Sequence, residues 1–94
     1  MTTFNKKTAF ITGGASGIGL GMAKAFLNAG ANVAIGDINE EQLLIAEKEL
    51  KTISENVISL KIDTTDPSTL ESASTKIGDS FGHLHYLCNN AGIP

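Results

Sequence analysis

The feature that most constrains this chain is the repeated change between two apolar periodicities along its length. Short runs of consecutive apolar or β-branched residues predict strands. They alternate with longer segments in which apolar residues recur every three or four positions, as in a helix. The predicted order is strand 8–12, helix 17–28, strand 31–36, helix 39–53, strand 56–62, helix 67–81 and strand 83–88. Strands that alternate with helices of this length require right-handed crossovers and a parallel sheet.

The same pattern predicts the helix caps and the buried faces. Asn39, with Gln42 three residues later, predicts an N-terminal cap, and Asp66 followed by Pro67 predicts another. The faces expected to be buried are Ile18, Met22, Ala25, Phe26 and Ala29 in the first helix, Leu43, Ala46, Leu50 and Ile53 in the second, and Leu70, Ala73, Ile77 and Phe81 in the third. Three of the four strands are too apolar for a sheet with one solvent-exposed face, so helices should cover both faces. The predicted fold class is α/β, a doubly wound parallel sheet in three αβα layers.

Composition excludes several classes of protein. The 94 residues carry seven lysines, no arginine and a net charge of −3, so they lack the concentrated positive charge that nucleic-acid binding requires. The one cysteine, Cys88, forms no disulfide within the chain, and no zinc-ligand spacing is present, so no metal site is predicted. No run approaches the roughly 20 apolar residues of a membrane span, and the first residues have no secretory apolar region. A single cytoplasmic domain without nucleic-acid or membrane partners is expected.

A glycine-rich segment, Thr12-Gly13-Gly14-Ala15-Ser16-Gly17-Ile18-Gly19, joins the first strand to the first helix. Glycine tolerates positive φ angles, and its missing Cβ lets the backbone approach a pyrophosphate closely. The helix that follows directs unpaired N–H groups and a partial positive charge at the same point. A plain glycine-rich turn is the alternative, but the position after the first strand favours phosphate binding. A Walker P-loop is excluded, because Gly17-Ile18-Gly19 stands where Gly-Lys-Ser/Thr is required.

Asp37 ends the second predicted strand, 18 residues after Gly19. This is near the spacing at which a carboxylate meets the adenosine ribose of a dinucleotide. Such a carboxylate accepts hydrogen bonds from the ribose 2′- and 3′-hydroxyls and repels a 2′-phosphate. Because the neighbours Gly36 and Ile38 are not basic, NAD is the expected cofactor and NADP is disfavoured. The alternative is that Asp37 only caps the turn into the second helix.

Polar residues also follow the third and fourth predicted strands. Asp63, with Thr64 beside it, stands where a carboxylate accepts a hydrogen bond from the adenine amino group, although a solvated loop explains it equally well. Asn90 follows the fourth strand. Ligands of doubly wound sheets bind outside the carboxyl ends of the strands, where the strand order reverses. Because the first and fourth strands flank that reversal, Gly13 and Asn90 are predicted to face one crevice.

Four residues near the fourth strand are open to a functional or a structural interpretation. His83 and His85 alternate like a metal-binding pair, but a third ligand is missing, so partly exposed strand-end positions are favoured. Cys88 is interpreted as a small core residue. Tyr86, the one tyrosine of the chain, is interpreted as a packing residue and not as a general acid.

Together these motifs resemble the N-terminal half of the short-chain dehydrogenase/reductase family. Thr12-Gly13-x-x-x-Gly17-x-Gly19 is similar to the family's glycine signature, and Asn89-Asn90-Ala91-Gly92 is similar to its second signature. The resemblance implies a partial NAD(P)-binding Rossmann-type domain over residues 1–94, truncated after the fourth strand. The cofactor contacts that it implies are Gly13, Ser16, Gly17, Ile18, Gly19, Asp37, Ile38, Asp63, Thr64, Asn90, Ala91 and Gly92.

The resemblance also implies a reaction, hydride transfer between the nicotinamide and an alcohol or ketone, with a Tyr-x-x-x-Lys pair as acid/base. This chain departs from the family there, because Tyr86 is followed four residues later by Asn90. No catalytic residue is therefore assigned. The complete protein is expected to be an NAD-dependent, homo-oligomeric oxidoreductase acting on CH–OH groups, and the chain alone is expected to be inactive. The alternatives are a free-standing nucleotide-binding or interaction module and a fragment of an S-adenosylmethionine-dependent methyltransferase, against which the Asn-Asn-Ala-Gly motif counts.

Overall fold

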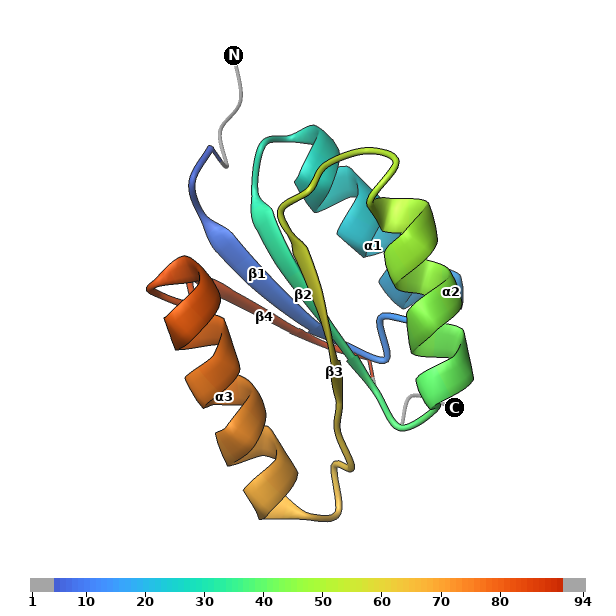
Figure 1. The fold of residues 1–94 in the computed structure, drawn as a ribbon, viewed down its shortest axis with the longest axis vertical. Coiled ribbons are helices and arrows are strands. Elements are labelled where there is room, and N and C mark those ends of the chain that lie inside the picture. The colour runs from blue at the N-terminus through green and yellow to red at the C-terminus, as the bar shows by residue number, and fades with distance from the viewer. Residues whose placement is uncertain (1–4, 91–94) are drawn as a thin grey trace.

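The computed structural model describes residues 5–90, which form a parallel sheet flanked by helices (Figure 1). Along the chain the elements are β1 (Thr8–Thr12), α1 (Gly17–Asn28), β2 (Asn32–Asp37), α2 (Glu40–Leu50), β3 (Val57–Lys61), α3 (Pro67–Phe81) and β4 (Tyr86–Asn89). The strand order is β3-β2-β1-β4, with every neighbouring pair parallel. The chain therefore builds outward from β1 to β3 and then crosses back to place β4 on the other side of β1. This confirms the predicted doubly wound α/β fold.

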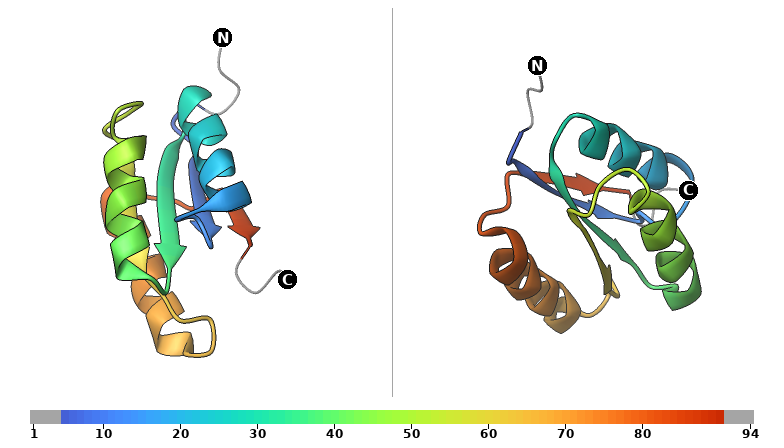
Figure 2. Two further views of the ribbon diagram at one scale, coloured as in Figure 1. Left: turned by 90° about the vertical axis from the view of Figure 1, so that its right-hand side faces the viewer. Right: turned by 45° about the horizontal axis from the view of Figure 1, so that its top comes forward.

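The helices form two layers, one on each face of the sheet. Helices α1 and α2 cover one face and α3 covers the other, as the right-hand view of Figure 2 shows. Successive strand residues point to opposite faces, so Ile11 and Ile35 pack under α1 and α2, whereas Phe10 and Ala34 pack under α3. Both faces of the central strands are thus buried, which explains their continuous apolar sequence.

The buried face of α1 differs from the predicted one. Its buried residues are Gly19, Ala23 and Leu27, whereas Ile18 and Ala25 are exposed and Met22, Phe26 and Ala29 are partly buried. The reason is a close approach: a Cβ on Gly19 would lie only 2.1 Å from the carbonyl oxygen of Gly13. The rotation of α1 about its own axis is therefore set by Gly19, which lacks a Cβ, and not by the large apolar residues of the helix.

The predicted caps of α2 and α3 are confirmed. Asn39 accepts the N–H of Gln42 at 3.0 Å, and Asp66 accepts the N–H of Ser68 at 3.0 Å. The predicted sheet-facing residues of both helices are buried or partly buried except Ile53, which is exposed. Helix α2 ends at Leu50, so Ile53 lies beyond it and the second predicted helix was too long.

Strand β4 begins at Tyr86, later than predicted, so His83 and His85 precede the strand and are exposed. The N–H of Thr8 donates to Nδ1 of His85 at 3.0 Å, which gives this histidine a structural contact at the start of β1. The ring of Tyr86 lies 5.7 Å from that of Phe26 in α1, so the packing interpretation is confirmed. Cys88 is partly buried against the α1 side of the core, and this burial raises the pKa of its thiol.

Candidate functional site

The glycine turn between β1 and α1 is the centre of the candidate site. Gly13 and Gly17 have φ angles of 66° and 58°, the left-handed region that glycine occupies without strain. Gly19 lies against the Gly13 carbonyl, where any side chain would overlap the backbone. The three glycines of the predicted signature therefore have separate physical roles: two turn the chain, and the third lets α1 start against the end of β1.

The N-terminus of α1 is left open by its own sequence. Ser16 occupies the N-cap position, but within the described chain its side chain makes no capping hydrogen bond. The first turn reads Gly17-Ile18-Gly19 and carries no charge. The first N–H groups of a helix have no partner inside the helix, and they concentrate partial positive charge. An anion such as a pyrophosphate suits this position, because Ser16, Gly17 and Ile18 are exposed and the first turn carries no competing carboxylate.

The turn into Asn90 is brought to the same edge of the sheet. The N–H of Asn90 donates to the carbonyl of Thr12 at 3.1 Å, and the Thr12 hydroxyl donates to Oδ1 of Asn89 at 2.8 Å. The Nδ2 atom of Asn90 lies 3.4 Å from the sulfur of Met22 in α1. The end of β4 is thus tied to the residue that precedes Gly13, at the point where the strand order reverses. Ala91 and Gly92 lie outside the described residues.

Asp37 ends β2 next to this turn and is partly buried. Its Oδ1 accepts the N–H of Asn39 at 3.2 Å, so the residue does help to close the turn into α2. The other oxygen, Oδ2, makes no hydrogen bond to the described residues and is available to a hydroxyl. The two interpretations of Asp37 are therefore compatible, because one carboxylate has two oxygens.

Lys61 is a neighbour of this position that sequence reasoning missed. It lies in register with Asp37 on the adjacent strand β3, and its ammonium is 3.6 Å from Oε1 of Glu40 in α2. Apolar runs alone do not give this register, because Ile62 continues the run past Lys61 and the polar residue that closes it is Asp63. Any preference for a ribose hydroxyl or a 2′-phosphate must take account of this cation.

Asp63 lies in the loop between β3 and α3, and that loop is closed by its own side chains. Oδ1 of Asp63 accepts hydrogen bonds from the hydroxyl of Thr65 at 2.6 Å and from its N–H at 2.9 Å. The hydroxyl bond, followed by the backbone bond, lowers the pKa of the Asp63 carboxyl. Asp63 is therefore a carboxylate at neutral pH, and Thr64 beside it is exposed.

Two large apolar side chains are exposed near the turn and near Asp37. Ile18 is 77% exposed at the start of α1, and Ile38 is 61% exposed directly after Asp37. Both residues are in the predicted contact set, and both present an apolar surface to any flat ring bound beside the turn. Over residues 5–90, no group of three or more His, Cys, Asp or Glu side chains is arranged to hold a metal ion. In the same part of the chain, every helix is too short or too polar to cross a membrane.

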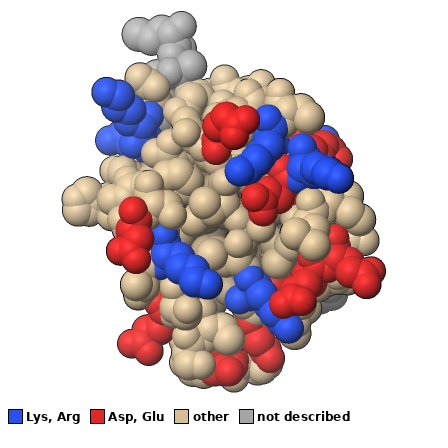
Figure 3. Space-filling model, in the orientation of Figure 1, with Lys and Arg blue, Asp and Glu red and all other residues tan. Residues whose placement is uncertain are grey.

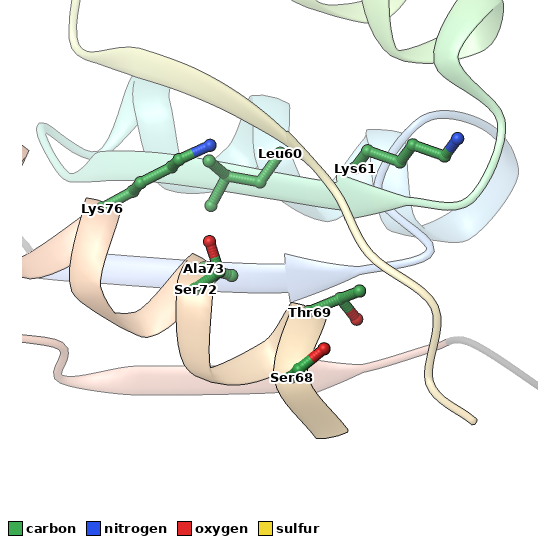
Figure 4. Close-up of a pocket in the computed structure, with 7 residues that line it drawn as sticks. All are labelled: Leu60, Lys61, Ser68, Thr69, Ser72, Ala73 and Lys76. Atoms are coloured by element: carbon green, nitrogen blue, oxygen red, sulfur yellow. The ribbon is translucent and has the colours of Figure 1, made fainter. Parts of the chain in front are cut away.

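A separate cavity of about 290 Å³ lies between β3 and α3 (Figure 4). Its lining residues are Leu60, Lys61, Ser68, Thr69, Ser72, Ala73 and Lys76. Ser68 donates to Asp66 and Thr69 to backbone carbonyls, so both hydroxyls serve the start of α3. Because none of the predicted cofactor contacts lines it, this cavity is distinct from the candidate site.

Comparison with known proteins decides the family of this chain. The family model described as short chain dehydrogenase matches residues 7–94, which is nearly the whole sequence. The chain belongs to the short-chain dehydrogenase family.

Individual short-chain dehydrogenases are similar over most of this chain but are longer. The chain is 43% identical over 93 residues to the short chain dehydrogenase/reductase dpmpG of Macrophomina phaseolina, covering 98% of this chain and 53% of that protein. It is 40% identical over 87 residues to 2,5-dichloro-2,5-cyclohexadiene-1,4-diol dehydrogenase LinX of Sphingobium indicum, covering 93% of this chain and 35% of that protein. The chain thus spans between about a third and half of these relatives.

Solved structures of short-chain dehydrogenases share the fold. L-sorbose reductase from Gluconobacter frateurii, complexed with NADPH and L-sorbose, superposes with a TM-score of 0.89 at 31% identity, over 96% of this chain and 35% of that one. A short-chain dehydrogenase/reductase from Burkholderia phymatum in complex with NAD superposes with a TM-score of 0.87 at 26% identity, over 93% and 31% respectively. The oxidoreductase family is therefore confirmed, both nicotinamide cofactors occur among the neighbours, and the methyltransferase alternative is not favoured.

Proposed function

We propose that residues 1–94 are the NAD-binding part of a short-chain dehydrogenase and that the cofactor lies across the carboxyl ends of β1, β2 and β4. The observation that carries this proposal is the uncapped, uncharged N-terminus of α1, built on a glycine turn in which Gly14 and Gly19 leave no space for a Cβ. The residues present fit a dinucleotide, because a Cβ at Gly14 or Gly19 would overlap the backbone while the helix N-terminus is open to an anion. The bound cofactor would supply the hydride acceptor or donor of the reaction.

Each predicted contact has a distinct role in this proposal. The first-turn N–H groups at Gly17, Ile18 and Gly19 bind the pyrophosphate, with Gly13 and Ser16 shaping the turn beside it. Oδ2 of Asp37 accepts the ribose hydroxyls. Asp63 and Thr64 meet the adenine, Ile18 and Ile38 provide apolar contacts, and Asn90 lies towards the nicotinamide side. Ala91 and Gly92 complete the proposed set of contacts on the strength of the second signature alone.

NAD is proposed over NADP because of the charge at Asp37. A carboxylate accepts two hydroxyl hydrogens but repels a phosphate, whose charge at neutral pH is also negative. The nearby cation, Lys61, is held by Glu40 at 3.6 Å and is therefore partly neutralised. The balance at the ribose favours the hydroxyls of NAD.

The complete protein is proposed to be a cytoplasmic, homo-oligomeric NAD-dependent oxidoreductase that interconverts an alcohol and a ketone. The 94-residue chain alone is proposed to be inactive, because it lacks the Tyr-x-x-x-Lys pair. Loss of an acid/base group alone costs on the order of 10² to 10⁴ in rate. Turnover of any secondary alcohol with NAD by this chain, above the uncatalysed background, would contradict the inactivity.

Isothermal titration calorimetry on the 94-residue chain tests the cofactor. NADH is expected to bind with measurable heat, NADPH to bind more weakly, and S-adenosylmethionine not to compete with NADH. Tighter binding of NADPH than of NADH would overturn the NAD preference. The absence of heat with both dinucleotides, from a chain whose circular dichroism is that of a folded α/β protein, would overturn the proposed function itself.

A further inference from the structure

The outward face of α2 carries an apolar surface that the cofactor site does not use. Leu44 is 68% exposed and Ile45 is 61% exposed, although both lie in the middle of the helix. The opposite face of α2 already packs on the sheet through its own buried residues, Leu43, Ala46 and Leu50. A cavity of about 470 Å³ lies beside the exposed pair, lined by Leu44, Ile45, Glu47, Lys48 and Lys51. Two adjacent exposed apolar side chains beside such a hollow form a candidate interaction surface.

Opposite charges flank this apolar pair. At 3.6 residues per turn, Glu41 and Lys48 lie on the same outward line of α2, one turn to either side of Leu44 and Ile45. Glu41 and Lys48 are exposed, and neither takes part in an ion pair with another described residue. Figure 3 shows acidic side chains over the N-terminal end of α2 and side chains of both signs over its C-terminal end, where Glu47 and Glu49 form ion pairs with Lys51 and Lys24. The four residues Glu41, Leu44, Ile45 and Lys48 are called the α2 patch below.

We propose that the α2 patch binds a second copy of this chain, with the two α2 helices antiparallel about a two-fold axis. The midpoint between positions 41 and 48 is also the midpoint between positions 44 and 45. A two-fold axis at this point brings the apolar side chains of both copies together and places each Glu41 opposite Lys48 of the second copy. A two-fold interface must be self-complementary, and the α2 patch meets this requirement in charge and in hydrophobicity.

The arrangement of charges selects this occupant over others. A lipid surface or a nucleic acid would require one sign of charge along the whole patch, and here the sign reverses between its ends. An antiparallel arrangement also sets the positive end of one helix dipole beside the negative end of the other. The proposal is independent of the cofactor site, because Asp37 and the glycine turn lie outside the α2 patch.

Sedimentation velocity over a range of concentrations tests the proposal on the 94-residue chain. The chain is expected to form a concentration-dependent dimer. Glu41→Lys and Lys48→Glu, each alone, are expected to weaken the dimer about tenfold, because each places two like-charged pairs across the two-fold axis. The double variant Glu41→Lys/Lys48→Glu restores opposite charges and is expected to return to within a factor of about three of the wild type.

Glu71→Lys is the matched control, since Glu71 is an exposed glutamate on α3, in the other helix layer. It makes the same change of charge and is expected to leave the dimer unaffected. Circular dichroism establishes that each variant is folded before sedimentation. A chain that remains monomeric at all concentrations overturns the proposal. A dimer whose affinity is unchanged by both single charge reversals also overturns it, as does a double variant that dimerises as weakly as the single variants.

Discussion

The two turns that lead from a strand into α1 and into α3 differ in how they treat the unpaired N–H groups at the start of a helix. The turn into α3 is closed by side chains: Asp66 caps Ser68, Thr69 donates to backbone carbonyls, and Oδ1 of Asp63 is bound by Thr65. The turn into α1 relies on glycine backbone, and its cap residue Ser16 makes no capping bond to the described chain. One helix start is satisfied by side chains of the protein itself, and the other has no side-chain cap within the described chain.

The difference shows how a helix can be held in place without a side-chain cap at its N-terminus. Helix α1 compensates for its open start by packing closely, because Gly19 lies directly against Gly13. Helix α3 needs no such approach and is held by its cap and by Ala73 and Ile77 in the core. Glycine contacts thus hold α1 in place where side-chain hydrogen bonds hold α3.

The largest expected effect comes from adding a Cβ at Gly19, where α1 lies directly against the Gly13 carbonyl. Gly19→Ala places a Cβ 2.1 Å from the Gly13 carbonyl oxygen and is expected to lower the free energy of unfolding by about 3 kcal/mol. Thermal or urea unfolding measures the loss, and NADH binding should be lost with it. Gly21→Ala is the control: it lies in the same helix with open space around it and should stabilise the chain by about 0.5–1 kcal/mol. Equal effects at the two positions would contradict the close-approach argument.

The next effect tests the carboxylate beside the open turn. Asp37→Ala removes the proposed ribose acceptor and is expected to weaken NADH binding by at least tenfold, since a charge-assisted hydrogen bond contributes about 1.5–3 kcal/mol. NADPH binding should stay the same or improve. Calorimetry with both cofactors measures the change, and Asp79→Ala on exposed α3 surface is the control. An unchanged ratio of the two affinities would show that Asp37 serves only the turn into α2.

A pair of cap substitutions compares the two helix starts directly. Asp66→Ala removes the cap of α3 and is expected to lower the free energy of unfolding by about 1 kcal/mol. Ser16→Ala removes a side chain that makes no capping bond within the described chain, so the change should stay within about 0.5 kcal/mol. Chemical unfolding of both variants measures the two changes in the free energy of unfolding. A larger loss at Ser16 than at Asp66 would reverse the comparison.

The smallest effect concerns the charge in the closed loop. Thr65 lowers the pKa of Asp63 in the folded chain, so this stabilisation is present at neutral pH and is lost as the pH falls through the lowered, folded-state value. Thr65→Val removes the hydroxyl bond and keeps the backbone bond. The pKa of Asp63 should therefore rise towards its ordinary value, as followed by NMR titration of the carboxyl carbon. A pKa that does not move would mean that the hydroxyl bond is not formed in solution.

The sequence predicted correctly those features that depend on interactions between residues close together in the chain. The caps at Asn39 and Asp66 were predicted correctly because a cap depends on residues within one turn of itself. The rotation of α1 was predicted wrongly, because it depends on the contact between Gly19 and a carbonyl in the preceding turn, which apolar periodicity does not report. The start of β4 was missed for a similar reason, since the bond from Thr8 to His85 spans most of the chain.

The features of the candidate site also fall into those that the sequence could predict and those that only the structure shows. The glycine turn and Asp37 could be predicted from spacing alone. The approach of Lys61 to Asp37 follows from strand register and appears only in three dimensions. The hydrogen bond from the N–H of Asn39 to one oxygen of Asp37, which leaves the other oxygen for the proposed ribose contact, likewise appears only in the structure.

Titration of NADH into the isotopically labelled chain, followed by amide NMR spectra, tests the central claim that α1 begins at an anion site. The account predicts that the largest shifts fall on the amides of Gly17, Ile18 and Gly19, while those of Ser68 and Thr69 in the first turn of α3 stay in place. Shifts of equal size at both helix starts, or shifts confined to α3, would contradict it.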